Sequence, residues 1–263
     1  MPRRAARPSA KILDLRESWK RTLLAENKSA STIAVYTSAV DLLSAYVETN
    51  HGAKTVDEIK KAEVEEFIAD LLATRKPATA SNRYRALQAF FGWCVREGEV
   101  ERSPMETMRP PSVPETPVPV LSDDQLRTLL KSCEGKTFED RRDMAMIRLL
   151  LDTGMRRGEL AGMTIVDVDF ELDVALVVGK GSRPRACPFG KKTAVALDRY
   201  LRERVHHPQG DLEALWLGQR GAIKPNGVQQ IVEKRGRRAG IQGLHPHQLR
   251  HTFASSWLSQ GGN

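Results

Sequence analysis

The sequence predicts a mainly α-helical protein with one small antiparallel β-sheet, arranged as two domains. Apolar residues recur at three- and four-residue spacing over most of the chain, which is the pattern of amphipathic helices. Between residues 164 and 188 the spacing changes to the alternation that is typical of strands. A proline-rich stretch at residues 103–119 separates two parts, and a length of 263 residues suits two domains of ordinary size.

Charge and composition indicate a nucleic-acid partner. The formal net charge is +8, and most of the excess follows residue 118, where 23 Lys and Arg face 17 Asp and Glu; before that point the counts are 18 and 16. Such an excess favours binding to polyanions, and a merely basic surface is the alternative. No apolar run approaches the roughly 20 residues of a membrane span, so no membrane partner is predicted. Three cysteines far apart argue against a disulfide framework and for a reducing, cytoplasmic location.

The first domain is expected at residues 12–102, after a disordered basic arm at residues 1–11 that lacks the apolar run of a secretory signal. Apolar spacing predicts four helices in this domain: the first from residue 12, the second after a polar cap at 28–31, and the third from about residue 61. Because Lys76-Pro77 interrupts the pattern, the fourth helix is expected to begin at Thr79 or Ser81.

The fourth helix also carries candidates for DNA contacts. Its apolar side chains, from Tyr84 to Cys94, are expected to face inward, which leaves a polar face with Ser81, Arg83, Arg85 and Gln88. This face could enter a DNA groove or contact phosphates, and an ordinary solvated face is the alternative. Ser29 and Thr32, at the capped start of the second helix, complete the set of candidate DNA contacts.

Prolines at residues 103–119 predict an extended linker, followed by a second domain at residues 120–263. Ser122 and Gln125 form a capping box at the start of its first helix. The elements expected are helices at about 123–133, 140–152, 190–204, 226–238 and 246–259, and antiparallel strands at 166–170, 174–178 and 184–188.

Two motifs in the second domain place cations at tight turns. In Thr153-Gly154-Met155-Arg156-Arg157-Gly158-Glu159-Leu160, Gly154 suits the left-handed position that ends a helix, so Arg156 is expected at a helix–helix corner. A guanidinium fixed there can present a planar fork to a phosphate. In Gly179-Lys180-Gly181 a lysine lies at a hairpin tip, where it can contact a base or donate a proton. The alternatives are a surface arginine and a solvated turn lysine.

A third motif, His245-Pro246-His247-Gln248-Leu249-Arg250-His251, opens a helix. Pro246 suits the first turn, and His247 and Arg250 lie three residues apart on one face, where the helix dipole also favours an anion. Leu249, Phe253 and Trp257 are expected on the buried side. The three histidines lack a fourth ligand at zinc spacing, so no metal is predicted, and His251 is expected to pack in the core.

Taken together and in this order, these motifs resemble the tyrosine site-specific recombinases, the phage integrase and Xer-like family, over roughly residues 10–263. The resemblance implies a helical, SAM-like core-binding domain followed by an α+β catalytic domain. It also implies DNA integration or other site-specific recombination on double-stranded DNA, through a 3′-phosphotyrosyl intermediate and without metal or other cofactor.

The resemblance assigns roles to individual residues. Arg156 and Arg250 would hold the non-bridging phosphate oxygens, whose charge grows in the transition state. Lys180 would protonate the 5′-oxygen leaving group, and His247 would assist proton transfer. Glu159 and His251 would orient these groups without reacting.

The sequence departs from the family pattern after the third motif. The family's later His or Trp, in a Leu-Gly-His stretch, and its nucleophilic tyrosine are both missing, and packing accounts for the four tyrosines Tyr36, Tyr46, Tyr84 and Tyr200. We therefore expect a recombinase truncated before its nucleophile, which binds DNA without cleaving it and leaves an apolar surface uncovered. Full-length members are expected to act as tetramers on two DNA sites, and a monomer is an alternative for this chain.

Three other functions remain alternatives. The chain could be a non-catalytic decoy or regulator that occupies recombination sites. A type IB topoisomerase uses a similar set of residues. A metallohydrolase would use the three histidines as ligands.

Overall fold

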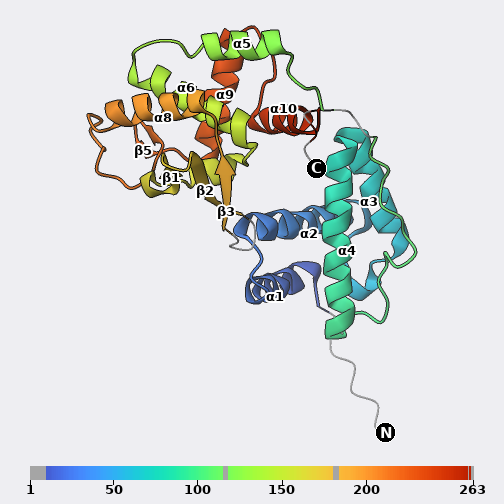
Figure 1. The fold of residues 1–263 in the computed structure, drawn as a ribbon. Coiled ribbons are helices and arrows are strands. Elements are labelled where there is room, and N and C mark those ends of the chain that lie inside the picture. The colour runs from blue at the N-terminus through green and yellow to red at the C-terminus, as the bar shows by residue number, and fades with distance from the viewer. Residues whose placement is uncertain (1–9, 115–117, 180–183, 260, 262–263) are drawn as a thin grey trace. The chain divides into compact units, whose positions relative to one another are not determined.

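The structure, a computed structural model, describes residues 10–114, 118–179, 184–259 and 261. It confirms a mainly helical chain with small antiparallel sheets (Figure 1). The chain divides into two compact units, Met1–Thr116 and Pro117–Asn263, called the first and second unit below.

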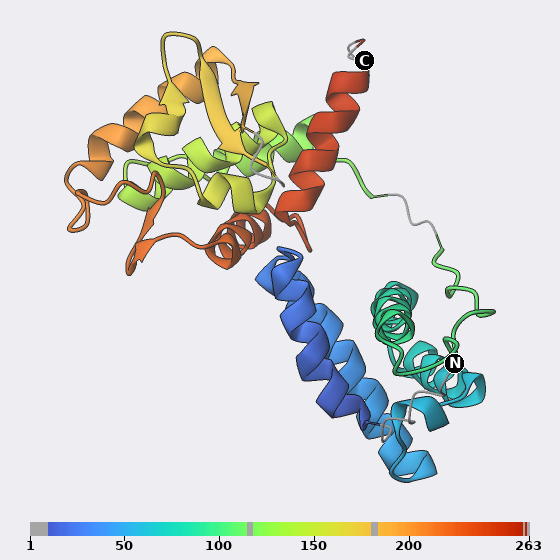
Figure 2. The same cartoon turned by 90° about the horizontal axis from the view of Figure 1, so that it is seen from below.

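The first unit consists of helices around an aromatic core. Trp19 stacks on Tyr36 and meets Phe90 edge to face, and Phe90 also contacts Phe91 and Trp93. Helices α1 and α2 lie side by side along their length (Figure 2). The elements are α1 (Ile12–Ala25), α2 (Ala30–His51), a 3-10 turn (Val56–Glu58), α3 (Lys61–Thr74) and α4 (Pro77–Glu97).

Helix α2 is long and apolar enough to cross a membrane by length and composition alone. The sequence analysis did not identify it as a candidate span. Its residues Ala39, Val40 and Leu43 are fully buried against the other helices of the first unit. The apolar character of α2 therefore serves this core.

Two boundaries in the first unit differ from the sequence predictions. Helix α4 begins at Pro77 and not at Thr79 or Ser81, because proline suits the first helical position, where its missing N–H has no partner to lose. The start of the proline-rich stretch packs on the first unit: Met105 is buried, and the Tyr84 hydroxyl donates a hydrogen bond to the Met108 carbonyl (2.8 Å). The first residues of the predicted linker, as far as Met108, therefore pack on the first unit.

In the second unit, helices pack against one face of a three-stranded antiparallel sheet, and the other face is exposed. The strand order is β1-β2-β3, and Ala175 lies opposite Cys187 in the register. The elements are α5 (Asp123–Lys131), α6 (Phe138–Thr153), α7 (Arg157–Ala161), a 3-10 turn (Ile165–Asp167), β1 (Val168–Asp169), β2 (Val174–Val178), β3 (Pro184–Pro188), α8 (Lys191–Arg204), β4 (Leu217–Gly218), β5 (Gly221–Ala222), α9 (Pro225–Arg238) and α10 (Pro246–Ser259). The β4–β5 hairpin was not predicted, because strands of two residues are too short to show alternation.

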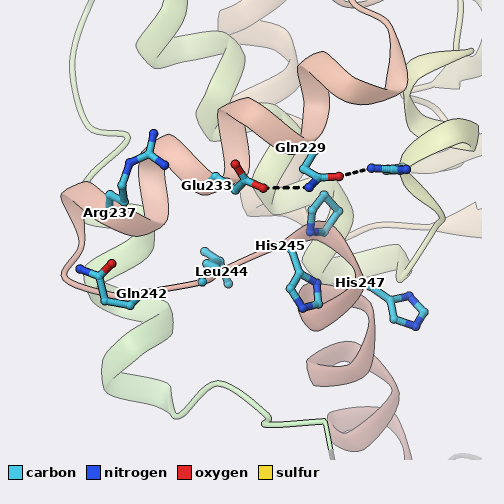
Figure 3. A pocket seen from close by; sticks show the side chains of 10 residues that line it. Gln229, Glu233, Arg237, Gln242, Leu244, His245 and His247 are labelled. Atoms are coloured by element: carbon cyan, nitrogen blue, oxygen red, sulfur yellow. Dashed lines mark hydrogen bonds between the residues drawn. The ribbon is translucent and has the colours of Figure 1, made fainter. Parts of the chain in front are cut away.

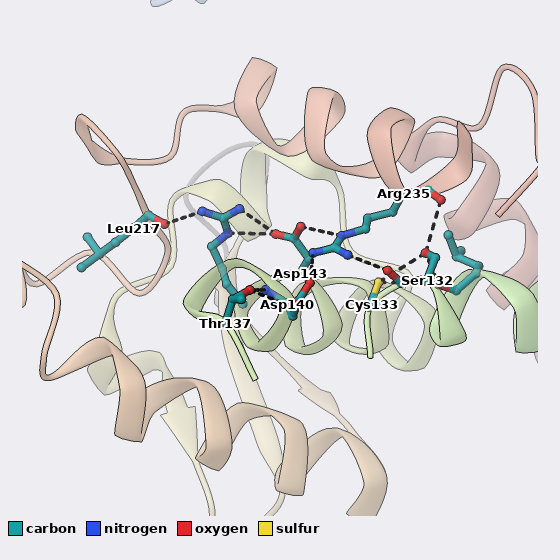
Figure 4. Close-up of polar contacts among 9 residues, drawn as sticks. Ser132, Cys133, Thr137, Asp140, Asp143, Leu217 and Arg235 are labelled. Atoms are coloured by element: carbon teal, nitrogen blue, oxygen red, sulfur yellow. Dashed lines mark hydrogen bonds and ion pairs between the residues drawn. The ribbon is translucent and has the colours of Figure 1, made fainter. Parts of the chain in front are cut away.

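A buried ionic network joins α6 to α9 (Figure 4). Asp143 is 1% exposed and accepts hydrogen bonds from Nε of Arg235 (2.7 Å) and Nε of Arg142 (2.9 Å). Arg235 also donates to Asp140 (2.9 Å), and Arg142 donates to the Leu217 carbonyl (3.1 Å). Because every charge has a partner, the network fixes the two helices without leaving a bare buried ion.

Tyr200 is a core residue, as predicted. Its hydroxyl donates to the Leu215 carbonyl (2.9 Å) and accepts from the Leu217 N–H (3.0 Å). Burial raises the pKa of Tyr200 to about 12. The three cysteines are free and buried, in agreement with the prediction of no disulfide framework.

Candidate functional site

The corner predicted around Gly154 is present. Gly154 ends α6 in the left-handed conformation (φ 56°), and Arg156 is the N-cap residue of α7. A Cβ atom on Gly154 would lie 2.2 Å from Cδ1 of Phe253 on α10, so only glycine fits between the two helices. The corner therefore depends on α10 as well as on its own sequence.

Glu159 fixes Arg156 on this corner. Its carboxylate accepts from the Arg156 N–H (2.7 Å) and from Nη1 of Arg156 (3.0 Å). It also accepts hydrogen bonds from both terminal nitrogens of Arg185 on β3, at 3.1 and 2.8 Å. The Glu159 side chain is 7% exposed, whereas that of Arg156 is 61% exposed. A buried carboxylate thus orients an arginine that remains free to meet a ligand.

These contacts change the ionisation of Glu159. Burial by itself would raise the pKa of the carboxyl group. The hydrogen bonds from Arg185 and Arg156, together with the charge of Arg185, outweigh burial and lower the pKa from 4.5 to about 2.

We expect Glu159→Gln to lower stability in a pH-dependent way. Because the folded pKa lies below the unfolded one, the ionic contribution is complete above about pH 4.5 and is lost as pH falls toward 2. The free energy of unfolding should differ between wild type and variant by at most about 3 kcal/mol at neutral pH, and the difference should shrink below pH 4.5. Urea unfolding at a series of pH values measures it.

Glu203→Gln is the matched control, since Glu203 also pairs with an arginine, Arg141, but its side chain is 34% exposed against 7% for Glu159. We expect this control to cost less than about 1 kcal/mol. A wild-type-to-E159Q difference that stays constant from pH 7 to pH 3 would contradict the prediction.

The start of α10 holds the second half of the site. Nδ1 of His245 and its carbonyl accept the Gln248 N–H (3.2 and 3.0 Å), which caps the helix ahead of Pro246. Arg250 donates from Nη1 to the Gly154 carbonyl. This bond joins α10 directly to the corner, two residues before Arg156.

His247 lies within the electrostatic field of both arginines. Burial lowers the pKa of His247, and the charges of His251, His245, Arg250 and Arg156 lower it further, in that order. The His247 and His251 rings meet edge to face at 4.4 Å. The structure therefore brings together three of the four predicted catalytic residues, Arg156, His247 and Arg250; Lys180 lies outside the described residues. His251 is partly buried beside His247 and not enclosed in the core.

A pocket of about 450 Å³ adjoins this cluster (Figure 3). Its lining includes His245, His247, Arg157 and Arg237, whereas Arg156 and Arg250 lie outside it. Figure 3 shows Glu233 and Gln229 joined by a hydrogen bond (2.8 Å), and Gln229 in turn accepts from Arg157. The sequence analysis did not identify this polar wall, which is formed mainly by α9 and the residues before α10.

Sequence reasoning also missed Arg185. A signal was available, because Arg185 shares its strand face with the buried Cys187, and an arginine on a buried face needs a carboxylate partner. The partner, Glu159, is 26 residues away in sequence and could not be identified from spacing.

Two expectations about side chains are wrong. Ser81 is 4% exposed, because it lies one turn before the buried Tyr84 and shares its face, so it does not belong to the DNA-contact set. Trp257 is 52% exposed and does not pack on the buried side of α10 with Leu249.

The remaining candidates for DNA contacts differ in how exposed their side chains are and in whether they form internal hydrogen bonds. Arg85 and Gln88 are exposed, and Ser29 caps α2 by accepting the Thr32 N–H (3.2 Å). Arg83 is partly buried and donates to the Val35 carbonyl (2.8 Å). Within the described residues, Arg85 and Gln88 are therefore the members of the set whose side chains are exposed and form no hydrogen bond or ion pair.

Within the part of the chain that the structure describes, no three His, Cys, Asp or Glu side chains gather at metal-binding spacing. The ring nitrogen Nδ1 of His245 accepts a backbone hydrogen bond, and His247 lies among cations. These surroundings suit an anion.

Comparisons with known protein families match both units. A model described as "Phage integrase family" matches residues 119–263, and one described as "Phage integrase, N-terminal SAM-like domain" matches residues 15–98. The tyrosine recombinase XerC of Roseiflexus castenholzii is 33% identical over 255 residues, covering 93% of this chain and 80% of the relative. The tyrosine recombinase XerD of Listeria monocytogenes is 28% identical over 257 residues, covering 95% and 86%.

Solved structures share the fold. The lambda integrase dimer bound to a COC′ core site has a TM-score of 0.76 at 16% identity, covering 96% of this chain and 88% of that one. The Tn1549 transposon integrase in complex with a circular intermediate DNA has a TM-score of 0.78 at 19% identity, covering 97% and 89%. At these identities the likeness concerns the fold alone.

Proposed function

Because the chain belongs to the phage integrase family of site-specific tyrosine recombinases, we propose that it binds a duplex DNA recombination site and presents Arg156, His247 and Arg250 to the scissile phosphate. One observation carries this proposal: Arg250 donates to the carbonyl of Gly154, two residues before Arg156, while His247 lies in the field of both arginines. The three groups thus gather at one corner of the second unit although they come from distant parts of the sequence.

The chemistry of the cluster fits phosphoryl transfer. Attack on a phosphodiester adds negative charge to the non-bridging oxygens, and cations that are already fixed stabilise that charge without reorganising. Arg156 and Arg250 take this role. His247, whose pKa is lowered in the free protein, would regain its proton beside a phosphate and hydrogen-bond to it. We assign protonation of the 5′-oxygen to Lys180, as the family pattern implies.

The four tyrosines of these 263 residues are engaged in packing. Tyr200 and Tyr84 are buried with their hydroxyls hydrogen-bonded. Tyr36 stacks on Trp19, and Tyr46 packs against Phe67, both in the first unit. We assign all four tyrosines to packing and infer that these 263 residues bind DNA but do not cleave it by themselves.

We also propose which surfaces meet DNA. In the second unit, Arg157, Gln229 and Arg237 line the pocket beside His247 and would contact the strand next to the scissile phosphate. In the first unit, Arg85 and Gln88 on α4 are exposed polar side chains. The lambda integrase is known as a tetramer bound to a Holliday junction, and we propose the same stoichiometry, on two DNA sites in the cytoplasm, for an active assembly that includes this chain.

A trapping experiment tests the proposal. Mixed with nicked suicide half-sites taken from the recombination sites of XerC and XerD relatives, the chain should retard the DNA on a native gel and form no covalent adduct on a denaturing gel. Binding should weaken roughly a thousandfold between about 50 and 200 mM salt, as expected for several phosphate contacts.

An active relative that forms an adduct on the same DNA is the positive control. An adduct that disappears when one of the four tyrosines is changed to phenylalanine would overturn the assignment of the nucleophile. Failure to bind any of the half-sites, or binding insensitive to salt, would overturn the function itself.

The packing of all four tyrosines also favours a second candidate, a non-catalytic regulator that occupies recombination sites. If the chain acts in this way, adding it in excess to an active relative should inhibit recombination, and Arg156→Ala should relieve the inhibition. Enhanced recombination by the mixture would instead place the chain inside the active assembly.

A further inference from the structure

The second unit has a larger hollow, of about 1000 Å³, between α6 and α8. These two helices lie side by side (Figure 1). None of the residues that line the hollow belongs to the cluster of Arg156, His247 and Arg250. It is called the α6–α8 groove below, and the proposed function gives it no role.

The rim of the groove is cationic and largely unneutralised. Three of its cations are paired: Arg141 with Glu203, Lys191 with Asp173, and Arg202 with Asp198. Four others have no carboxylate partner within the residues that the structure describes: Lys136, Arg148, Lys192 and Arg199.

The carboxylates of the groove do not offset these four cations. Asp140 already pairs with the buried Arg235 (2.9 Å). Among the lining residues this leaves Glu134 as the one carboxylate that forms no ion pair within the described part of the chain. Four like charges along one groove repel one another, so a bound anion would reduce this repulsion and lower the electrostatic free energy.

The floor of the groove is apolar. Cys133 and Ala196 are buried beneath the rim, and Met144 is partly buried. Val195, which is 48% exposed, adds an apolar side chain at the edge. The groove therefore offers a cationic border around a strip on which apolar side chains would lose contact with water.

We propose that the α6–α8 groove binds an acidic, amphipathic segment of a partner protein, with carboxylates on the rim and apolar side chains on the floor. Helices bind protein grooves in this way, with apolar anchors at helical spacing. Complementary charge would speed association and select the partner.

Nucleic acid fits the groove less well. Grooves that hold single strands stack bases on aromatic side chains, and the groove lining contains no Phe, Tyr, Trp or His. A duplex presents a convex phosphate surface that gains nothing from an apolar floor inside a concavity. The observations thus favour a peptide over DNA.

A peptide-binding measurement tests the proposal on the full chain. The probe is a fluorescein-labelled synthetic helix of Glu and Leu, with the leucines on one face, followed by fluorescence anisotropy. A scrambled peptide of the same composition, whose leucines do not share a face, separates charge from shape. Lys192→Glu combined with Arg199→Glu removes two exposed rim cations and should weaken probe binding roughly tenfold, or about 1.4 kcal/mol.

Arg220→Glu is the matched control, because Arg220 is an exposed arginine of the second unit outside the groove. It should change probe affinity less than twofold. Arg148→Glu tests the rim again on the other helix, and circular dichroism verifies the fold of each variant.

Four results would overturn the proposal. The wild type could fail to bind the probe, or could bind the scrambled peptide equally well. The double variant could weaken duplex DNA binding far more than Arg220→Glu does while leaving the probe unaffected, which would make the groove a DNA surface. The full chain could self-associate in a way that the double variant abolishes, which would make the occupant a second copy of this chain.

Discussion

Replacing Asp143 with alanine is expected to destabilise the second unit by about 3–5 kcal/mol, because it leaves the buried Arg235 and Arg142 without their shared carboxylate. Asp143 and Arg235 are each 1% exposed in their side chains, so water cannot replace the lost partner. Since a whole domain is typically stable by only 5–15 kcal/mol, the loss would leave much of the second unit open.

Hydrogen exchange measured by mass spectrometry is the appropriate readout, because it reports on each unit separately. Amides of α6 and α9 should exchange much faster in the variant, while those of α2 and α4 in the first unit should not change. Asp143→Asn provides a milder variant if the alanine form does not accumulate.

Asp198→Ala is the control for losing an ion pair as such. Asp198 pairs with Arg202 at 2.6 Å, but both side chains are more than half exposed, so less than about 0.5 kcal/mol should be lost. Equal effects of the two substitutions would show that burial of the network is not what stabilises it.

Replacing Gly154 with alanine is expected to cost about 2–5 kcal/mol and to disturb the arrangement of Arg156, His247 and Arg250. Two terms add. The left-handed conformation costs a residue with a Cβ atom roughly 1–2 kcal/mol. The new Cβ atom would also lie 2.2 Å from the Phe253 ring, and relieving such overpacking typically costs about 1–3 kcal/mol.

The clash would act on function through one hydrogen bond. Arg250 donates to the Gly154 carbonyl, so a displaced corner moves Arg250 relative to Arg156. We therefore expect weaker binding to the half-sites as well as lower stability, measured by gel retardation and urea unfolding.

Two further variants separate the terms. Gly98 ends α4 in the same left-handed region (φ 75°) with no atom within 4 Å of an added Cβ, so Gly98→Ala should cost only the backbone term. In a Phe253→Ala background the ring is gone, and Gly154→Ala should again cost only about 1–2 kcal/mol. An unchanged cost in that background would exclude the clash as the cause.

Local sequence signals predicted most helices of this protein. The capping box of Ser122 and Gln125 and the left-handed Gly154 are each complete within a few residues, so they could be read without tertiary information. The exceptions are also local: the two-residue strands of the β4–β5 hairpin carry too little pattern, and the start of α4 at Pro77 was misread because proline both ends and begins helices.

The candidate site divides in the same way. Its motifs indicated Arg156, Glu159, His247 and Arg250, which carry the resemblance to the recombinase family. Arg185, and the polar wall around Gln229, were found only in the structure, because their partners are distant in sequence and no periodicity relates them.

By itself the sequence determined the helix and strand pattern, the two-part organisation and the residue types that can hold a phosphate. Only the tertiary structure decided which of these groups meet: Arg250 and Gly154 are 96 positions apart, Arg235 and Asp143 are 92 apart, and Arg185 and Glu159 are 26 apart. Spacing along a helix or strand relates residues that are near in sequence, whereas these pairs form because packing of α6, α9, α10 and β3 places them together. The physical reason is that a buried or clustered charge is stable only with a partner at hydrogen-bonding distance, and that distance is fixed by the packed core.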